Sequence, residues 1–418
     1  MIKRTQALIM LMSMGVVPLL EAIIPYNIFQ PYDVLLMPYR SPIDHVRIMV
    51  GYEGAVHTRA FLGDDTDMLT RTQTTVNVLQ IWQKHQDAIA AFKGSAPETA
   101  IGQLAQQLNI DDDNTQHGIY TPCAKLHMPA NILFGMQWRL PHHIKLAVFI
   151  PYRVAELTNV SWKQHNPQVT YEEIVTPDLI AEIEQVSDMC LRGWKRHGFG
   201  DLMIQADYTL YIPQNKPWLK NVGLDVRGGL LFPTGLKENP NLLLGLPFGY
   251  DAGVGILAAA RLELCYIHEI LFGVDVELLH LFGNTRMRRI KINPAQTDLL
   301  FLTKVPAFKD PGFTQHYTLY LEKLALYKNL SIQLAYQYTK HNDDKLFVCQ
   351  EGYSPAIINS AESLQDWTAH NLIGKISYEW LDAKGYVNPS FSLFVKTGFN
   401  GKRAILADTV GALFTMNF

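Results

Sequence analysis

The sequence contains few cysteines, no excess of positive charge and, after its first twenty residues, no long apolar run. Its four cysteines, Cys123, Cys190, Cys265 and Cys349, stand far apart without a C-x-x-C pair, which argues against a zinc site and leaves disulfide pairing open. Polar residues interrupt every later apolar stretch, whereas a helical membrane span needs about 20 apolar residues. The 36 basic and 39 acidic residues among 418 give a net charge of −3. We therefore expect no nucleic-acid partner, no metal and no cofactor.

The amino terminus has the three parts of a secretory signal. Lys3 and Arg4 precede an apolar run from Ala7 to Leu20, and small Ala22 stands where a signal peptidase would cut. The run is too short and too interrupted to cross a bilayer core of about 30 Å. The alternative, a buried helix of a cytoplasmic protein, leaves the two basic residues unexplained, so we expect an exported protein.

Many later segments alternate apolar and polar residues with a period of two. From Leu202 to Ile212 the even positions are apolar, while Gln205, Asp207 and Thr209 share the opposite face. This pattern is typical of a strand with one face in lipid and one in a polar lumen, for which about 9 to 11 residues suffice. A soluble β-sandwich alternates in the same way, but its strands are usually about 5 or 6 residues long. The longer runs favour an all-β, antiparallel transmembrane barrel.

The alternating segments predict twelve strands, with short turns at one end of the barrel and long loops at the other. Twelve places both termini on the periplasmic side. Weak alternation over residues 70–82, paired with a further strand over 24–35, would make fourteen, and this alternative stays open. The predicted strands cover residues 45–62, 122–140, 143–161, 198–212, 218–232, 250–266, 268–290, 314–328, 330–347, 367–381, 388–399 and 403–418.

The last fifteen residues form an alternating strand that ends in an aromatic side chain. This strand resembles the closing strand of bacterial outer-membrane β-barrels, in which the barrel assembly machinery reads a terminal Phe preceded by apolar residues at every second position. The resemblance implies the outer membrane of a Gram-negative cell, with its lipids and its assembly machinery as partners. It assigns Phe414, Met416 and Phe418 to barrel closure and assembly. We expect this strand to pair with residues 45–62.

If the alternation is continuous, the inner wall carries charges of both signs. A structural network of ion pairs and a path for solutes explain such a wall equally well. The expected lumen-lining residues are Arg47, Glu53, Arg59, Arg139, Asp207, Asp225, Arg227, Arg261, Glu263, Asp275, Glu277, Glu322, Lys375, Glu379 and Lys396.

Two long loops have helical periodicity. In the first, apolar residues recur at spacings of three and four from Val78 to Phe92 and again from Ile101 to Leu108. In the second, Thr176 and Pro177 mark a helix start, and Leu179 and Ile183 begin an apolar stripe. We expect the two loops to pack on each other and cap the outer mouth, while the alternative is that one folds into the lumen and gates it.

The expected organisation is therefore a signal peptide, an amino-terminal segment and one barrel. The signal peptide covers residues 1–22, and a periplasmic or lumenal segment covers 23–44. The barrel covers 45–418, with helical insertions at about 63–121 and 162–197.

The middle third contains three short motifs in order. Gly200-Asp201-Leu202 opens a strand, Pro233-Thr234-Gly235 follows the next strand, and a strand with Gly253 and Gly255 comes after that. Over residues 198–265 the chain resembles the outer-membrane transporter family named for meta-pathway phenol degradation, and more distantly the long-chain fatty-acid transporters. The long insertion before the second strand departs from that family and puts the identity of a substrate in doubt. Pro233, Thr234 and Gly235 are interpreted as structural residues that end a strand and form a turn.

These patterns favour a channel or transporter for passive uptake of small solutes, hydrophobic or aromatic ones among them, through a narrow charged lumen. A surface adhesion or structural barrel is the alternative. A lipase-type barrel enzyme is a third reading, because His142, His143, His268 and His341 lie near strand ends. No serine stands in a G-x-S-x-G motif, so we expect no enzyme.

Overall fold

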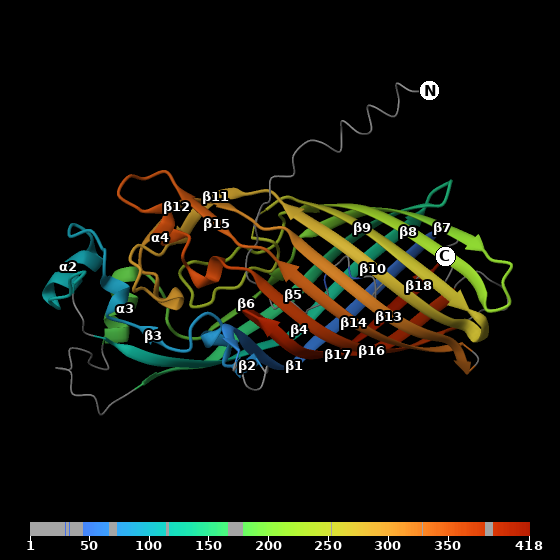
Figure 1. Cartoon of the computed structure of the whole chain (residues 1–418), viewed down its shortest axis with the longest axis horizontal. Coiled ribbons are helices and arrows are strands. Elements are labelled where there is room, and N and C mark those ends of the chain that lie inside the picture. The colour runs from blue at the N-terminus through green and yellow to red at the C-terminus, as the bar shows by residue number, and fades with distance from the viewer. Residues whose placement is uncertain are drawn as a thin grey trace, which may run out of the picture.

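The computed structural model shows a β-barrel with a folded cap at one end (Figure 1). It describes residues 30, 33, 45–66, 73–113, 117–165, 179–251, 253–327, 329–380 and 388–418. The predicted signal peptide lies outside these residues. No helix among the described residues is long and apolar enough to cross a membrane. The four cysteines are all free thiols.

Twelve antiparallel strand positions close the barrel, which confirms the predicted fold class and strand number. One position is shared by two strands, β6 and β7, which pair with successive parts of β5. The wall consists of β1 (Val46–Thr66), β4 (Ile119–Arg139), β5 (Ile144–Gln164), β6 (Trp194–Phe199) with β7 (Leu202–Pro213), β8 (Leu219–Phe232), β9 (Gly255–Tyr266), β10 (Ile270–Leu281), β13 (Thr314–Tyr327), β14 (Leu330–His341), β16 (Trp367–Glu379), β17 (Asn388–Lys402) and β18 (Ala404–Asn417).

Two of the predicted strands were too long. The segment 268–290 divides into β10 and β11 (Asn284–Arg289), and the segment 330–347 includes β14 and the start of β15 (Lys345–Val348). β11 and β15 leave the wall and join β12 (Lys304–Asp310) in a separate three-stranded sheet. Among the described residues of 70–82, the one strand is β2 (Gln73–Val76), which pairs with β1 but does not cross the wall.

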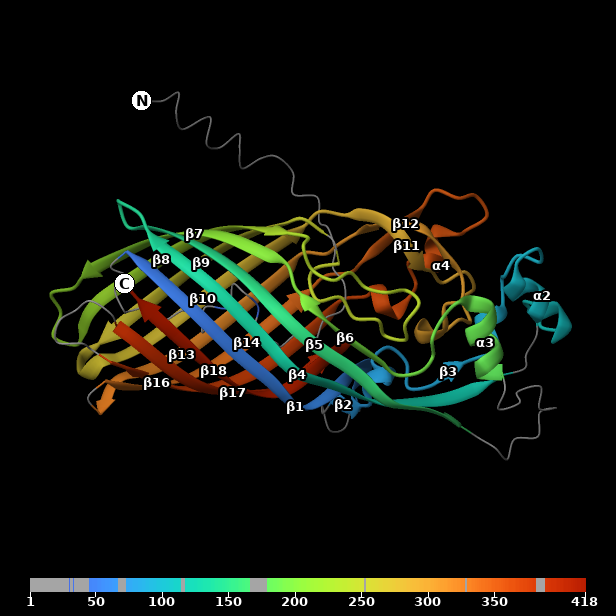
Figure 2. The same cartoon turned by 180° about the vertical axis from the view of Figure 1, so that it is seen from behind.

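The first and last strands close the barrel as expected. β1 pairs with β18 from Arg47 opposite Asn417 to Phe61 opposite Ala404, and it also pairs with β4. Figure 2 shows β1 beside both partners. The backbone of Phe418 donates to the Val46 carbonyl at 2.9 Å and accepts from the amides of His45 and Val46.

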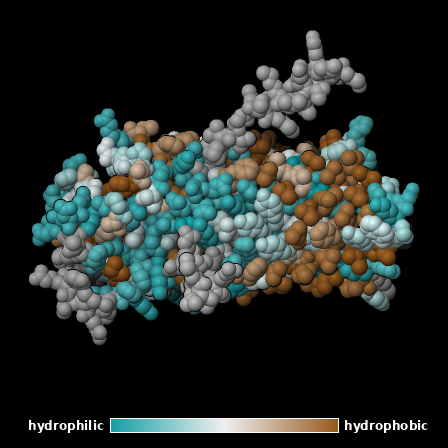
Figure 3. Space-filling model, in the orientation of Figure 1, coloured by the Kyte–Doolittle hydropathy of each residue, from teal (hydrophilic) through white to brown (hydrophobic). Residues whose placement is uncertain are grey.

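The outer face of the barrel is apolar over the half that lies away from the cap. Figure 3 shows this belt in brown and the cap in teal. Exposed aromatic side chains mark the strand ends at the short turns, including Tyr211, Trp218, Tyr327 and Trp380. Such side chains suit the headgroup level of a bilayer. Exposed apolar residues come from strands all round the wall: Ile48, Val226, Leu262, Phe272, Leu319, Leu334, Ile376, Val395 and Val410.

Short turns join strands at the apolar end, and most connections at the other end are long. By the usual pattern of such barrels, the short turns are periplasmic and the cap is extracellular. The β17–β18 connection is an exception, because Arg403 alone separates the two strands at the cap end. Its guanidinium anchors the cap through ion pairs with Glu362 at 2.6 Å and Asp366 at 3.2 Å.

The long loops fold together into the cap. One hydrophobic cluster joins the first loop to the second: Ala105 of α2 (Ala100–Gln107) and Ile183 of α3 (Leu179–Ser187) both belong to it. The predicted packing of the two helical loops on each other is thus confirmed. Thr176 and Pro177, the predicted start of the second helix, lie outside the described residues.

The helical periodicity between Val78 and Phe92 was misleading. This segment contains the 3-10 turns η2 (Val78–Gln80) and η3 (Ala90–Phe92) with β3 (Gln86–Asp87) between them. Its apolar residues are buried in the same cluster without forming an α-helix, because the cap surrounds them on several sides. A second cap cluster lies between η5 (Asp298–Leu300), the three-stranded sheet, α4 (Pro355–Ile358) and η6 (Glu362–Leu364).

Deletion of Phe418 tests the closure. We expect a smaller fraction of folded protein in the membrane, because the seam loses three backbone hydrogen bonds, each worth about 1 kcal/mol. The readout is the share of protein that keeps its compact mobility in unheated detergent gels. Phe399→Ala, which removes an exposed aromatic on β17 away from the seam, is the matched control. Equal yields from the two variants would contradict the role of the terminal residue.

Candidate functional site

The lumen is lined by buried charged side chains. Most of the residues that the alternation placed on the inner face are buried in the structure. Their role in solute passage stays a prediction. Arg139 is exposed, and Glu322, Lys375 and Glu379 are half-buried, all near strand ends at the short turns. Ten others are at most 5% exposed: Arg47, Glu53, Asp207, Asp225, Arg227, Arg261, Glu263, Asp275, Glu277 and Lys396.

Arg59 does not lie in the lumen, contrary to the expectation from sequence. The register of β1 against β18 shifts between Ala55 and His57, and this bulge reverses the alternation in the upper part of β1. Arg59 forms an ion pair with Asp408 at 3.0 Å, and Asp408 also accepts a hydrogen bond from the exposed Thr397. The sequence around residue 56 keeps its period of two, so the bulge could not be predicted from the alternation.

The centre of one lumen wall is an ion network around Arg227. Its guanidinium lies 2.5 Å from Asp275, 3.1 Å from Glu277 and 3.5 Å from Asp225. Arg261 lies 3.5 Å from the second oxygen of Asp225. Three carboxylates and two guanidinium groups are thus buried together, and each sign of charge offsets the desolvation of the other.

A second network runs along the opposite wall, across the neighbouring strands β18, β1, β4 and β5. The Glu53 carboxylate accepts hydrogen bonds from Thr409 at 2.7 Å and from Asn131 at 3.1 Å. The Asn131 side-chain oxygen in turn accepts from Arg153 at 3.2 Å, and Arg153 also donates to the Phe248 carbonyl at 2.8 Å. Arg153 was missed from the sequence, although it falls on the inward odd positions of its strand.

Two residues of the amino-terminal segment lie inside the barrel. Gln30 accepts a hydrogen bond from Arg153 at 3.0 Å. Asp33 is 4% exposed, accepts from Gln337 at 3.1 Å and lies 3.8 Å from the Lys396 ammonium. These contacts come from three separate strands, so this part of the segment is held across the bore. The sequence predicted a periplasmic or lumenal segment at 23–44 and left open a strand over 24–35, but it did not indicate these contacts of Gln30 and Asp33.

Towards the cap, β1 and β4 are no longer joined by backbone hydrogen bonds. The backbone ladder ends where Glu53 faces Asn131. Beyond that point side chains replace it: Thr58 donates to the Leu126 carbonyl at 2.6 Å, and the Asn77 amide both donates to and accepts from the backbone of Ala124. The first loop therefore closes the upper wall through side-chain hydrogen bonds.

The motifs of the middle third stabilise the backbone where the wall passes from β6 to β7. The Asp201 carboxylate accepts hydrogen bonds from the amides of Gly235 at 2.8 Å and Tyr250 at 2.5 Å. The Thr234 hydroxyl accepts from the Leu202 amide at 2.9 Å. A Cβ on Gly249 would stand 2.3 Å from the Asp201 carboxyl group, so only glycine fits there. The motif residues bind one another, as the structural interpretation predicted.

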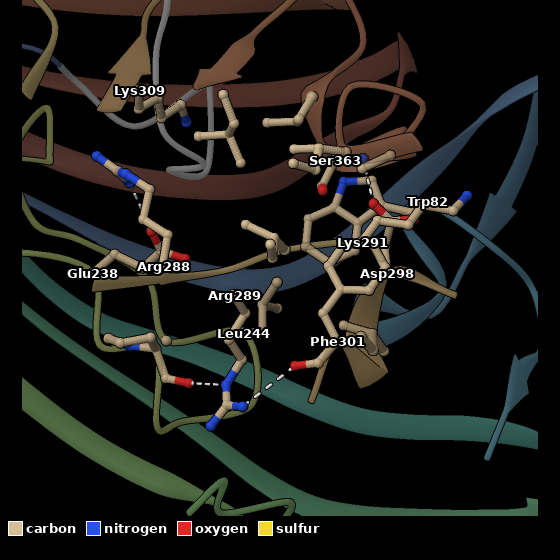
Figure 4. A pocket seen from close by; sticks show the side chains of 18 of the residues that line it. Trp82, Glu238, Leu244, Arg288, Arg289, Lys291, Asp298, Phe301, Lys309 and Ser363 are labelled. Atoms are coloured by element: carbon tan, nitrogen blue, oxygen red, sulfur yellow. Dashed lines mark hydrogen bonds and ion pairs between the residues drawn. The ribbon is translucent and has the colours of Figure 1, made fainter. Parts of the chain in front are cut away.

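The cap encloses a cavity of about 130 Å³ (Figure 4). Basic residues lie among its apolar lining, with Lys309 and Arg288 on one side and Lys291 on the other. Asp298 also lines it, and its carboxylate accepts from the Ser363 amide at 2.6 Å and from Gln83 at 2.8 Å. Burial raises the pKa of Asp298, although these hydrogen bonds oppose the shift.

A closed antiparallel barrel with an apolar outer belt and a charged interior is the architecture of a transmembrane β-barrel of the bacterial outer membrane. No protein-family model matches the chain, and no curated protein matches it. Solved structures with a similar arrangement include an outer membrane channel, COG4313, from Pseudomonas putida F1. At 10% identity it covers 93% of this chain and 99% of its own, with a TM-score of 0.49.

Two further similar structures are transport proteins or their homologues. The Ralstonia pickettii toluene transporter TbuX is 11% identical, with a TM-score of 0.32 over 89% of this chain and 88% of its own. A Pseudomonas aeruginosa FadL homologue is 7% identical, with a TM-score of 0.26 over 89% of each chain. The assignment of the fold rests on the strand pairing described above.

Substitution Arg227→Met tests the lumen network. We expect a loss of about 3 to 5 kcal/mol in the free energy of unfolding, because three buried carboxylates lose their shared partner. Denaturant unfolding in detergent micelles measures it. Arg192→Met removes an exposed guanidinium that pairs with Glu184 on the cap and should leave stability unchanged. If the two variants unfold alike, the buried network does not stabilise the barrel.

Proposed function

We propose that this protein is a passive outer-membrane channel for small solutes, with a path narrowed by the lumenal charge networks and by the segment that contains Gln30 and Asp33. The observation that carries this proposal is the position of Asp33. It lies inside the bore between Gln337 and Lys396, and hydrogen bonds and an ion-pair contact hold it there. Polar contacts of this kind can exchange with water.

The bore and the charge pattern support selection by size. A barrel of eight strands is filled by side chains, whereas sixteen or more strands leave an open aqueous channel, and twelve fall between. Arg227 and Arg261 are matched by neighbouring carboxylates, so the wall has no ring of one sign that would favour a strongly charged ion. The resemblance over residues 198–265 directs the proposal towards hydrophobic or aromatic solutes.

A surface-binding barrel is the second candidate, because the cap exposes apolar side chains on its three-stranded sheet. Met287, Phe308 and Phe347 are 37% to 50% exposed, and the two phenylalanine rings lie 6.3 Å apart. Phe347→Ser should reduce adhesion of cells that display the protein, and it should leave conductance unchanged. Unchanged adhesion in that variant would remove this candidate.

Planar-bilayer recordings of the purified full chain test the channel. We expect conductance from the wild type and higher conductance from Asp33→Ala, because the substitution removes the contacts with Gln337 and Lys396. Asp188→Ala, which removes an exposed carboxylate from the cap, serves as the control and should match the wild type. A wild type that passes neither ions nor small solutes would refute the proposed function. Equal conductance of Asp33→Ala and the wild type would refute the role of this segment.

A further inference from the structure

The cavity in the cap combines an apolar lining with basic side chains. Trp82, Phe301, Leu346 and Leu364 come from four separate segments and supply apolar surface. Its volume of about 130 Å³ is close to the ~150 Å³ of an apolar cavity that holds one benzene molecule. The space is therefore large enough for a body of one six-membered ring.

Lys291 is the basic residue with the fewest partners in this lining. It is 8% exposed, and within the described parts of the chain its ammonium has no hydrogen bond and no ion pair. Burial of a charged group without a partner is costly, so such a group usually has a ligand or counterion. The nearby Asp298 carboxylate attracts Lys291 electrostatically, but in the described structure the two do not form an ion pair, and the Asp298 oxygens already accept hydrogen bonds from Ser363 and Gln83.

The neighbouring arginines add positive charge to the same lining. Arg289 donates to backbone carbonyls, including those of Leu302 at 2.8 Å and Ser187 at 2.9 Å, and among the described residues no carboxylate lies at ion-pair distance from it. Arg288 pairs with Asp251 at 2.7 Å, but its buried Nε has no acceptor in the described structure. Glu238, which also lines the cavity, lies 3.7 Å from Arg288, so the donors that remain for an anion are the Lys291 ammonium and the Arg288 Nε.

We propose that the cap cavity binds a small aromatic carboxylate, with its ring against the apolar lining and its carboxylate as the acceptor that Lys291 lacks. This inference rests on the proposed transport function, because it places a capture site for one class of solute on the extracellular side of the lumen. A carboxylate fits better than a neutral ring, since a neutral ring would leave Lys291 buried without a partner.

Calorimetric titration of the purified full chain with benzoate tests the site. We expect saturable binding of benzoate, and binding about tenfold weaker for toluene, which lacks the charge, and for acetate, which lacks the ring. Lys291→Met should weaken benzoate binding about tenfold and leave toluene binding unchanged. Lys304→Met removes a cap lysine that pairs with Asp188 outside the cavity, and it should bind benzoate as the wild type does. Absence of benzoate binding, equal affinity for acetate, or full affinity in Lys291→Met would overturn the inference.

A second measurement needs no substitution. Cyanate is small enough to carbamylate a buried lysine, and mass spectrometry of digested wild-type protein reports the modification of Lys291. Benzoate should slow carbamylation of Lys291 and leave Lys304 unaffected; equal rates with and without benzoate would overturn the inference. A chain that conducts without binding benzoate refutes only the capture site, whereas one that binds benzoate without conducting refutes only the channel.

Discussion

The structure depends on the burial of charges of both signs inside a closed wall. Lipid on the outer face excludes charged side chains, so the alternation of each strand sends them inward. Inside, isolated charges would be costly, and the Arg227 network shows how the cost is offset: Arg227 lies beside Asp225 of its own strand and Asp275 of β10, and Arg261 of β9 lies beside Asp225. The registers of β8, β9 and β10 are therefore coupled, because a slip of one residue would break the pairs and expose them to lipid.

The same principle connects the barrel to its cap. Asp251 lies in the β8–β9 loop and forms ion pairs with Arg286 at 2.5 Å and Arg288 at 2.7 Å, both on β11 of the cap sheet. At the rim on the other side of the bore, Arg403 forms ion pairs with Glu362 and Asp366. Because the cap is fastened through charges at the rim, its position over the lumen is defined, and a solute that reaches the cavity is already near the entrance.

Period-two alternation, together with the resemblance of the last strand to barrel-closing strands, predicted the barrel and the pairing of the first strand with the last. Alternation favoured twelve strands and left fourteen open, and the structure has twelve. Alternation also placed residues such as Asp225 and Glu277 on the inner wall. A side chain on a barrel strand faces either the lipid or the lumen, so the parity of its position decides which. The alternation failed where the backbone departs from that period. The bulge at Ala55 turns Arg59 outward, and β10 ends before β11 although the alternating sequence continues.

Contacts made outside regular strands had no sequence signal. Gln30 and Asp33 bind residues of the barrel wall, a set of partners that the expected periplasmic or lumenal segment did not specify. The cap cavity forms where loops distant in sequence meet, so Lys291 and Trp82 could not be brought together by pattern alone. The helical spacing between Val78 and Phe92 correctly predicted that these apolar residues are buried, but it wrongly predicted an α-helix. A segment covered on several sides needs no helix to bury its apolar residues.

The most direct test of a narrow, size-selective path is the swelling of liposomes that contain the wild-type protein, in isotonic solutions of neutral solutes of increasing size. The account predicts swelling with solutes up to about one sugar or aromatic ring and none with disaccharides, because charge networks and the Gln30 to Asp33 segment occupy part of a twelve-stranded bore. Equal swelling rates for all sizes, or no swelling with any solute, would contradict it.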